Sequence, residues 1–197
     1  ELRDLHVVLE SAVRVGEAVQ HGRHPPREVL GAPDAAETRG RVPREQVGAC
    51  VGTKELVASL PHLLRLRTPA RDTVLYPAVA YPTYEMGARL AGLRAVPVPL
   101  DERWHLDLSR ISEADADRAL VIWVNEPGNP TGASGGRQHL RAVVDWAREC
   151  GAIVASDECY AEFTWDESGS PATPVTVLSA GHDRVLAVHS LSKRSNM

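Results

Sequence analysis

Two lysines stand out in this chain, because arginine supplies the other 20 of its 22 basic residues. Arginine stays protonated in proteins, whereas a lysine amine can lose its proton and act as a nucleophile. Lys193 follows the apolar stretch 185–188, in the segment Ser-Leu-Ser-Lys. A lysine that is desolvated at the end of a buried strand has a lowered pKa and can form an imine with a carbonyl compound. The alternative is a bias in nucleotide composition that spared Lys54 and Lys193 by accident.

A glycine turn precedes the other lysine. Gly52, Thr53 and Lys54 follow a short apolar stretch and open a segment with helical spacing. A helix that begins in this way presents unpaired backbone N–H groups and the positive end of its dipole, which suits a phosphate group. The segment matches neither GxxxxGK[ST] nor GxGxxG. The alternative is a tight turn from strand to helix with Thr53 as the N-cap residue.

The segment 125–132, Asn-Glu-Pro-Gly-Asn-Pro-Thr-Gly, is a sharper signal. Its two prolines and two glycines impose an irregular backbone directly after an apolar strand, where a simple turn would suffice. Such an arrangement is typical of a site, and Asn129 can donate or accept a hydrogen bond there. The alternative is an elaborate loop without a ligand.

A carboxylate ends another apolar stretch. Asp157 follows Ile153–Ser156, and Tyr160 comes three residues later. A carboxylate at that depth is costly unless it meets a cation or strong hydrogen-bond donors. The alternative is that Asp157 caps a helix.

Six short apolar stretches predict buried β-strands, and segments with helical spacing lie between them. The predicted strands are 47–51, 73–76, 95–98, 120–124, 152–156 and 185–188. Helices are expected from Gly52 through Leu64, over 83–91 and over 136–150, the last with Ser134 as its N-cap and Leu140, Val143, Val144 and Ala147 on its apolar face. Pro61 should kink the first helix or mark its first turn. This alternation predicts an α/β fold, a mostly parallel sheet flanked by helices with right-handed crossovers.

The first 46 residues are expected to be a separate N-terminal segment, with the α/β domain over 47–197. Residues 1–20 have helical spacing, with Leu5, Val8, Leu9, Ala12 and Val13 on one face. Residues 21–46 are expected to be irregular, because glycines, prolines and charges interrupt any period.

The candidate polar segments all follow predicted strands. Ligands of open α/β sheets bind at the carboxyl ends of the strands, so these segments should meet at one edge. Pyridoxal phosphate needs a lysine for its imine, an acid for its pyridine nitrogen, an anion site for its phosphate and donors for its phenolic oxygen. The chain therefore predicts a pyridoxal phosphate site, and no metal site.

Three segments resemble fold-type I, class I aminotransferases: NEPGNPTG at 125–132, SDECY at 156–160 and SLSKRSN at 190–196. Two more, GTKELVASLPHLL at 52–64 and YPAVAYPTYEMGARLAG at 76–92, are similar to the succinyldiaminopimelate aminotransferases of bacterial lysine and cell-wall biosynthesis. The resemblance runs from about Val47 to Asn196. It implies the large domain of a fold-type I enzyme, which binds pyridoxal phosphate.

The resemblance also implies a role for each site residue. Lys193 would be the Schiff-base lysine and would move a proton between the substrate α-carbon and the cofactor. Asp157 would keep the pyridine nitrogen protonated, while Tyr160 and Asn129 would hydrogen-bond the phenolic oxygen. Tyr81 would stack on the ring. The phosphate contacts would be Gly52, Thr53, Lys54 and Ser190.

The implied reaction transfers an amino group between glutamate and a keto acid. The implied substrate pair is N-succinyl-diaminopimelate and N-succinyl-2-amino-6-oxopimelate, and the implied assembly is a cytoplasmic homodimer. In the family an arginine for the cofactor phosphate and a small C-terminal domain, with the arginine for the substrate carboxylate, follow the lysine. Neither precedes Met197, so we expect this chain to be a fragment or the product of a disrupted reading frame.

Other functions stay open at this point. An inactive, truncated aminotransferase-like module could bind the cofactor or a partner without turnover. A β-elimination or racemisation would use the same cofactor residues. A NAD-binding domain is disfavoured because the glycine fingerprint is missing.

Composition excludes several classes of protein. The chain has 197 residues, 43% of them apolar and 24% charged, which is ordinary for a globular domain. A net charge of −4 does not show the excess of positive charge that is typical of nucleic-acid-binding proteins. The first residues do not resemble a signal peptide, and the longest apolar run, 119–124, is too short to span a membrane. Three cysteines without CxxC spacing fit a reduced, cytoplasmic setting.

Overall fold

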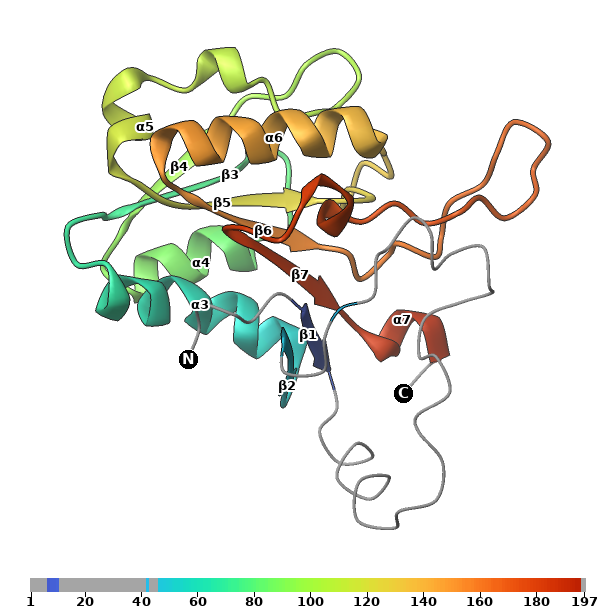
Figure 1. Cartoon of the computed structure of the whole chain (residues 1–197), viewed down its shortest axis with the longest axis horizontal. Helices are drawn as coiled ribbons and strands as arrows, with labels where there is room; N and C mark the ends of the chain where they lie inside the picture. The colour runs from blue at the N-terminus through green and yellow to red at the C-terminus, as the bar shows by residue number, and fades with distance from the viewer. Residues whose placement is uncertain (1–6, 11–41, 43–45, 196–197) are drawn as a thin grey trace, which may run out of the picture.

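A seven-stranded sheet forms the centre of the computed structural model, which describes residues 7–10, 42 and 46–195 (Figure 1). The strand order is β2-β1-β7-β6-β5-β3-β4, and every pairing is parallel. The strands are β1 (Val7–Glu10), β2 (Val47–Cys50), β3 (Thr73–Pro77), β4 (Arg94–Val98), β5 (Ala119–Asn125), β6 (Ile153–Asp157) and β7 (Val185–His189). The predicted α/β fold with a parallel sheet is confirmed.

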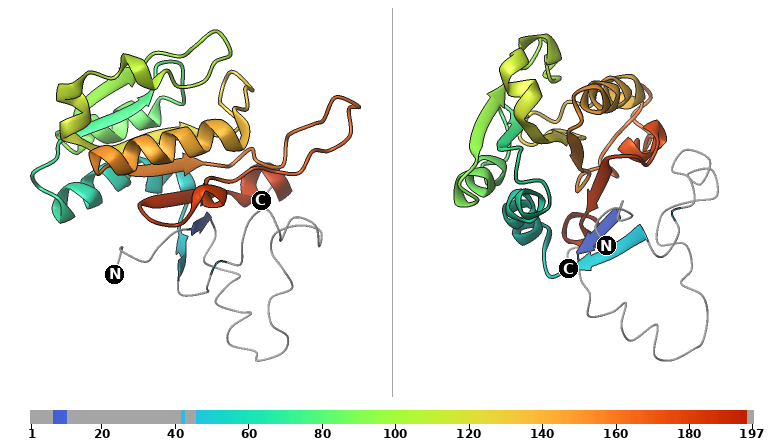
Figure 2. Two further views of the ribbon diagram at one scale, coloured as in Figure 1. Left: turned by 45° about the horizontal axis from the view of Figure 1, so that its top comes forward. Right: turned by 60° about the vertical axis from the view of Figure 1, so that its left-hand side comes forward.

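Helices cover both faces of the sheet (Figures 1 and 2). The described helices are α3 (Thr53–Arg67), α4 (Thr83–Leu90), α5 (Glu113–Arg118), α6 (Gly136–Cys150) and α7 (Leu191–Ser195), with short 3-10 turns η3 (Leu108–Arg110) and η4 (Val177–Ala180). One face packs against α6 and η4, and the other against α3 and α4. Buried strands alternate their side chains between these two cores, which explains why 120–124 is apolar throughout.

The segment Val7–Glu10 forms a strand, so the prediction of a helix there is wrong. It lies between β2 and β7 and pairs with both. A segment of four residues is too short to distinguish the period of a helix from that of a strand. The parallel strands on its two sides, β2 and β7, supply the backbone hydrogen bonds that favour the extended conformation. The rest of the predicted helix, and nearly all of the irregular stretch expected over 21–46, lies outside the described residues. The division at residue 46 stays a prediction.

The pair α3 and α4 packs closely. A Cβ atom added to Gly87 of α4 would lie 2.8 Å from the carbonyl oxygen of Ala58 in α3, so only glycine allows this approach. Pro61 lies in the middle of α3 and is buried, which excludes the predicted place in the first turn. The N-cap of α3 is Gly52, so the alternative of Thr53 as the cap is also wrong.

Helix α6 has the predicted bounds and the predicted buried face. It ends at Gly151, whose φ of 76° is the left-handed conformation that favours glycine at this position. Ser134 does not cap its amino end, contrary to the prediction, because its hydroxyl donates to the Glu126 carboxylate instead. Part of the segment between β6 and β7, closed by a bridge between Trp165 and Pro171, projects from the molecule as a loop (Figure 2).

Candidate functional site

Asp157 is the last residue of β6, and this residue is only 8% exposed. The Tyr84 hydroxyl, from α4, donates to Asp157 Oδ2 at 2.7 Å, and the Cys159 backbone N–H donates to Oδ1 at 3.1 Å. No helix begins at Asp157, so the alternative of a helix cap is wrong. The carboxylate is instead held by donors at the carboxyl end of the sheet, as its depth requires.

Tyr84 is a site residue that sequence reasoning missed. Its ring is buried and stacks on Trp123 of β5, with centroids 4.9 Å apart. Burial raises the pKa of Tyr84 well above its ordinary value, and the nearby Asp157 raises it further. The phenol therefore stays protonated and donates to Asp157. Tyr81, a predicted site residue, meets the Tyr84 ring edge-on at 5.9 Å.

The loop after β5 is tied to the same aspartate. Asn125 pairs with Asp157 in the sheet, and its side-chain N–H donates to the Asp157 carbonyl oxygen at 2.8 Å. The Asn125 side-chain oxygen accepts a hydrogen bond from the backbone N–H of Asn129 at 2.6 Å. Asn125 thus anchors Asn129 beside the end of β6, which brings two predicted site residues together.

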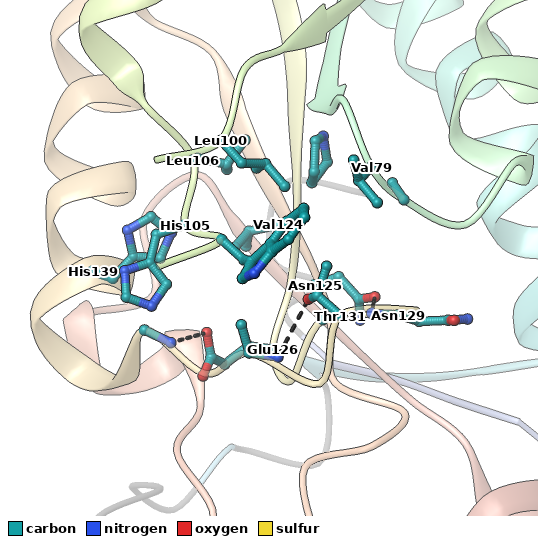
Figure 3. Close-up of a pocket in the computed structure, with 16 residues that line it drawn as sticks. Val79, Leu100, His105, Leu106, Val124, Asn125, Glu126, Asn129, Thr131 and His139 are labelled. Carbon is teal, nitrogen blue, oxygen red and sulfur yellow. Dashed lines mark hydrogen bonds between the residues drawn. The ribbon is translucent and has the colours of Figure 1, made fainter. Parts of the chain in front are cut away.

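Glu126 closes this loop, and sequence reasoning missed it too. The residue is only 3% exposed, and its carboxylate accepts from the Ser134 hydroxyl and from the backbone N–H groups of Gly135 at 3.1 Å and Gly136 at 3.3 Å. Burial raises the pKa of Glu126, and these three hydrogen bonds oppose the increase. The carboxylate caps α6 and joins the two ends of the loop that carries Asn129 (Figure 3).

A small pocket adjoins this loop (Figure 3). Val79, Leu100 and Leu106 give it an apolar wall, and Asn129 lies at its edge. His105 and His139 stack on its other side, with centroids 5.1 Å apart. Burial, with a smaller contribution from His105, lowers the pKa of His139 to about 4, so this ring is neutral at pH 7.

Lys193 lies on α7, which begins two residues after β7 ends. Its Nζ is 5.9 Å from the centroid of the Tyr160 ring, so the structure brings these two predicted residues together. The Ser190 hydroxyl accepts a hydrogen bond from the backbone N–H of Ser192 at 3.1 Å. Lys193 is exposed in the described chain, contrary to the prediction of a desolvated lysine, because it stands on a short surface helix and not within the strand.

Gly52, Thr53 and Lys54 open α3 at the carboxyl end of β2. The first N–H groups of a helix have no partner within it, and no side chain caps this end. In the sheet β1 separates β2 from β7, so this turn stands apart from Asp157 and Asn129.

Comparisons with known proteins show the family to which this chain belongs. The model of the family "Aminotransferase class I and II" matches residues 35–197. The chain belongs to this family. It is 40% identical over 185 residues to 4-dedimethylamino-4-oxo-anhydrotetracycline transaminase OxyQ of Streptomyces rimosus, covering 88% of this chain and 47% of that protein.

Two further aminotransferases are similar to this chain. It is 38% identical over 157 residues to the LL-diaminopimelate aminotransferase of Aquifex aeolicus, covering 79% of this chain and 39% of that protein. The structure of a probable N-succinyldiaminopimelate aminotransferase from Thermus thermophilus matches with a TM-score of 0.65 and 32% identity, covering 74% of this chain and 38% of that one. The chain thus spans less than half the length of these relatives.

Aminotransferases of this family use pyridoxal phosphate, and the residues present here fit it. A buried carboxylate at the end of β6 suits a protonated ring nitrogen, and the amino end of α3, which no side chain caps, suits a phosphate. Lys193, which follows β7, lies near the ring of Tyr160, which follows β6. In the part of the chain that the structure describes, no helix is long and apolar enough to cross a membrane.

Proposed function

We infer that this chain carries the cofactor-binding domain of a pyridoxal-phosphate-dependent aminotransferase, which transfers an amino group between glutamate and a keto acid. One observation supports this most strongly. The buried Asp157 carboxylate, held by Tyr84 and adjoining the anchored Asn129, lies at the same edge of the sheet from which Lys193 and Tyr160 project.

Each residue has a defined task in this proposal. Bound pyridoxal phosphate supplies an electron-withdrawing ring that stabilises negative charge at the substrate α-carbon. The Asp157 carboxylate would keep the ring nitrogen protonated, and the Tyr84 hydroxyl orients that carboxylate. Asn129 and Tyr160 would donate to the phenolic oxygen. Lys193 Nζ would attach the cofactor covalently and then carry a proton to and from the α-carbon.

The remaining predicted residues would fix the two ends of the cofactor. Backbone N–H groups of Gly52, Thr53 and Lys54 and the hydroxyl of Ser190 would bind its phosphate. The Tyr81 ring, which stands edge-on to Tyr84, would cover one face of the pyridine ring. These assignments rest on the motif resemblance together with the position of each residue at the carboxyl edge of the sheet.

The substrate that we propose is N-succinyl-2-amino-6-oxopimelate, with glutamate as the amino donor. The similarity to a probable N-succinyldiaminopimelate aminotransferase and to an LL-diaminopimelate aminotransferase supports a diaminopimelate-type substrate. The similarity to a tetracycline-pathway transaminase favours a second candidate, a polycyclic keto substrate. Steady-state rates with each keto acceptor at equal glutamate concentration would separate them.

The first experiment tests the cofactor site itself. The protein at its native length is incubated with pyridoxal phosphate, reduced with borohydride, digested and mapped by mass spectrometry. Label on Lys193, with little on Lys54, supports the proposal. Label scattered over surface amines contradicts it. Label on Lys193 without amino transfer from glutamate to any keto acid would favour the alternative, a module that binds the cofactor without turnover.

A homodimeric assembly and a cytoplasmic setting complete the proposal. Both follow from the family resemblance, and the three cysteines without CxxC spacing also suit a reduced compartment. Sedimentation velocity of the native-length protein would give the mass of a dimer, and a monomer at micromolar concentration would contradict the assembly.

A further inference from the structure

A buried carboxylate next to Asp157 has no task in the function described above. The Glu158 side chain is completely buried, and its Oε2 lies 3.3 Å from Nε2 of His189. Glu158 directly follows the strand that carries Asp157, and His189 ends the strand that leads to Lys193. One contact therefore connects the two segments that hold the proposed catalytic groups.

The two carboxylate oxygens of Glu158 are used differently. Oε1 accepts from the Ser156 hydroxyl at 2.9 Å and from the Val177 backbone N–H at 2.7 Å. These donors come from β6 itself and from η4, so they fix the orientation of the carboxylate. The other oxygen, Oε2, is the one that lies 3.3 Å from His189 Nε2, and the His189 side chain is 13% exposed.

The contact between Glu158 and His189 lies at the carboxyl ends of β6 and β7, where the backbone hydrogen bonds between these strands end. The Glu158 backbone N–H donates to the Val188 carbonyl oxygen at 2.8 Å, beyond the last paired residues, Asp157 and Val188. After that bond β6 turns away toward Tyr160, while β7 continues into α7. A side-chain contact at this fork limits how far the two segments can separate.

We propose that Glu158 and His189 form a clamp across the ends of β6 and β7 that positions Lys193 relative to Asp157. The proposal rests on the proposed function, in which Lys193 and Asp157 bind the same cofactor. The proposed function gives neither Glu158 nor His189 a contact with the cofactor, so we assign both of them a positioning role. Lys193 lies four residues after His189, in the helix α7 that begins just beyond the end of β7, so the position of that strand end affects where the lysine stands.

Two substitutions of similar chemistry test the clamp. In His189→Gln the amide nitrogen occupies the place of Nε2 and still reaches Glu158, whereas in His189→Asn it occupies the place of Nδ1 and falls short. Asp72→Asn is the control, since it removes an ion pair with Arg118 between β3 and β5 at the opposite end of the sheet. The measured quantity is the rate at which borohydride reduction traps pyridoxal phosphate on Lys193 in the native-length protein.

We expect labelling of Lys193 to slow about 10- to 100-fold in His189→Asn, because a displacement of about 1 Å is enough to cause such a loss. His189→Gln should recover the rate to within about threefold, and Asp72→Asn should stay within about twofold of the wild type. Equal rates for His189→Asn and the wild type, or no recovery in His189→Gln at an equal unfolding midpoint, would overturn the clamp. Absence of Lys193 labelling in the wild type would overturn the proposed function first, and the clamp with it.

Discussion

At the scale of single residues, the site depends on how charge and hydrogen bonds are arranged around buried side chains. Asp157 is tolerable at 8% exposure because the Tyr84 hydroxyl and the Cys159 N–H both donate to it. Tyr84 in turn stays a donor because burial raises its pKa. The aspartate therefore has a fixed orientation before any cofactor arrives.

This arrangement predicts graded effects of two substitutions. Asp157→Asn should lower kcat/KM for amino transfer by about 10²- to 10³-fold, because the amide cannot hold a positive charge on the ring nitrogen. Tyr84→Phe keeps the ring that stacks on Trp123 and removes one hydrogen bond, so its loss should be about tenfold or less. Steady-state kinetics at saturating pyridoxal phosphate measures both, and an equal loss in the two variants would contradict the assigned roles.

His139 predicts a pH dependence of stability. Its folded pKa of about 4 lies below the ordinary value of 6.5, so between these values the unfolded chain binds more protons than the folded one. The free energy of unfolding should therefore be highest above pH 6.5 and fall by about 1–3 kcal/mol as the pH drops to 4. In His139→Gln this fall should shrink, whereas His62→Gln, on an exposed part of α3, should leave it unchanged. Urea unfolding at several pH values provides the test.

At the scale of elements, close packing and helix capping decide where the site residues stand. Helix α4 carries Tyr84 to Asp157, and it does so by lying against α3 without a side chain at Gly87. Helix α6 begins where the Glu126 carboxylate accepts its first N–H groups. The same carboxylate closes the loop that carries Asn129.

Gly87→Ala should destabilise the protein by about 1–3 kcal/mol, because the new methyl group would lie 2.8 Å from the Ala58 carbonyl oxygen and force the helices apart. Met86→Ala, at an exposed neighbouring position, is the matched control and should change the free energy of unfolding by less than about 0.5 kcal/mol. Thermal and urea unfolding would show the difference, and similar effects of both substitutions would refute the tight contact.

Glu126→Gln should cost about 1–2 kcal/mol, because an amide cannot accept all three hydrogen bonds that the carboxylate accepts. Hydrogen exchange should also become faster at Gly135 and Gly136, whose N–H groups lose an acceptor. Ser134→Ala removes only one of the three donors and should lower the free energy of unfolding less than Glu126→Gln does. Unchanged exchange in Glu126→Gln would show that the carboxylate does not hold this helix end.

At the scale of the whole molecule, the parallel sheet gathers segments far apart in the sequence at one edge. The carboxyl ends of β5, β6 and β7 are adjacent, so residues near 125, 157 and 190 become neighbours. A ligand bound across this edge would connect several strands and stabilise the folded state as a whole.

Pyridoxal phosphate should therefore raise the stability of the native-length protein. At a concentration about 100 times its dissociation constant, the gain in the free energy of unfolding should be about 2.7 kcal/mol. Lys193→Ala should reduce this gain, since the covalent attachment is lost, whereas Lys54→Ala should retain most of it because Lys54 contributes through its backbone. Differential scanning fluorimetry with increasing cofactor would show whether the two variants differ.

The sequence by itself determined most of the helices and strands, and it singled out the residues to which we assign chemistry. Strands over 120–124 and 152–156 and helix α6 follow from local periodicity. Motifs within a few positions single out Asn129, Asp157 and Lys193 as candidates. The tertiary structure alone decided the contacts between distant residues: Tyr84 with Asp157 across 73 positions, Asn125 with Asp157 across 32, and Glu158 with His189. It also decided that Val7–Glu10 is a strand. Periodicity records which face of an element is apolar, but the partner of a buried polar group is chosen only when the folded chain brings the two together.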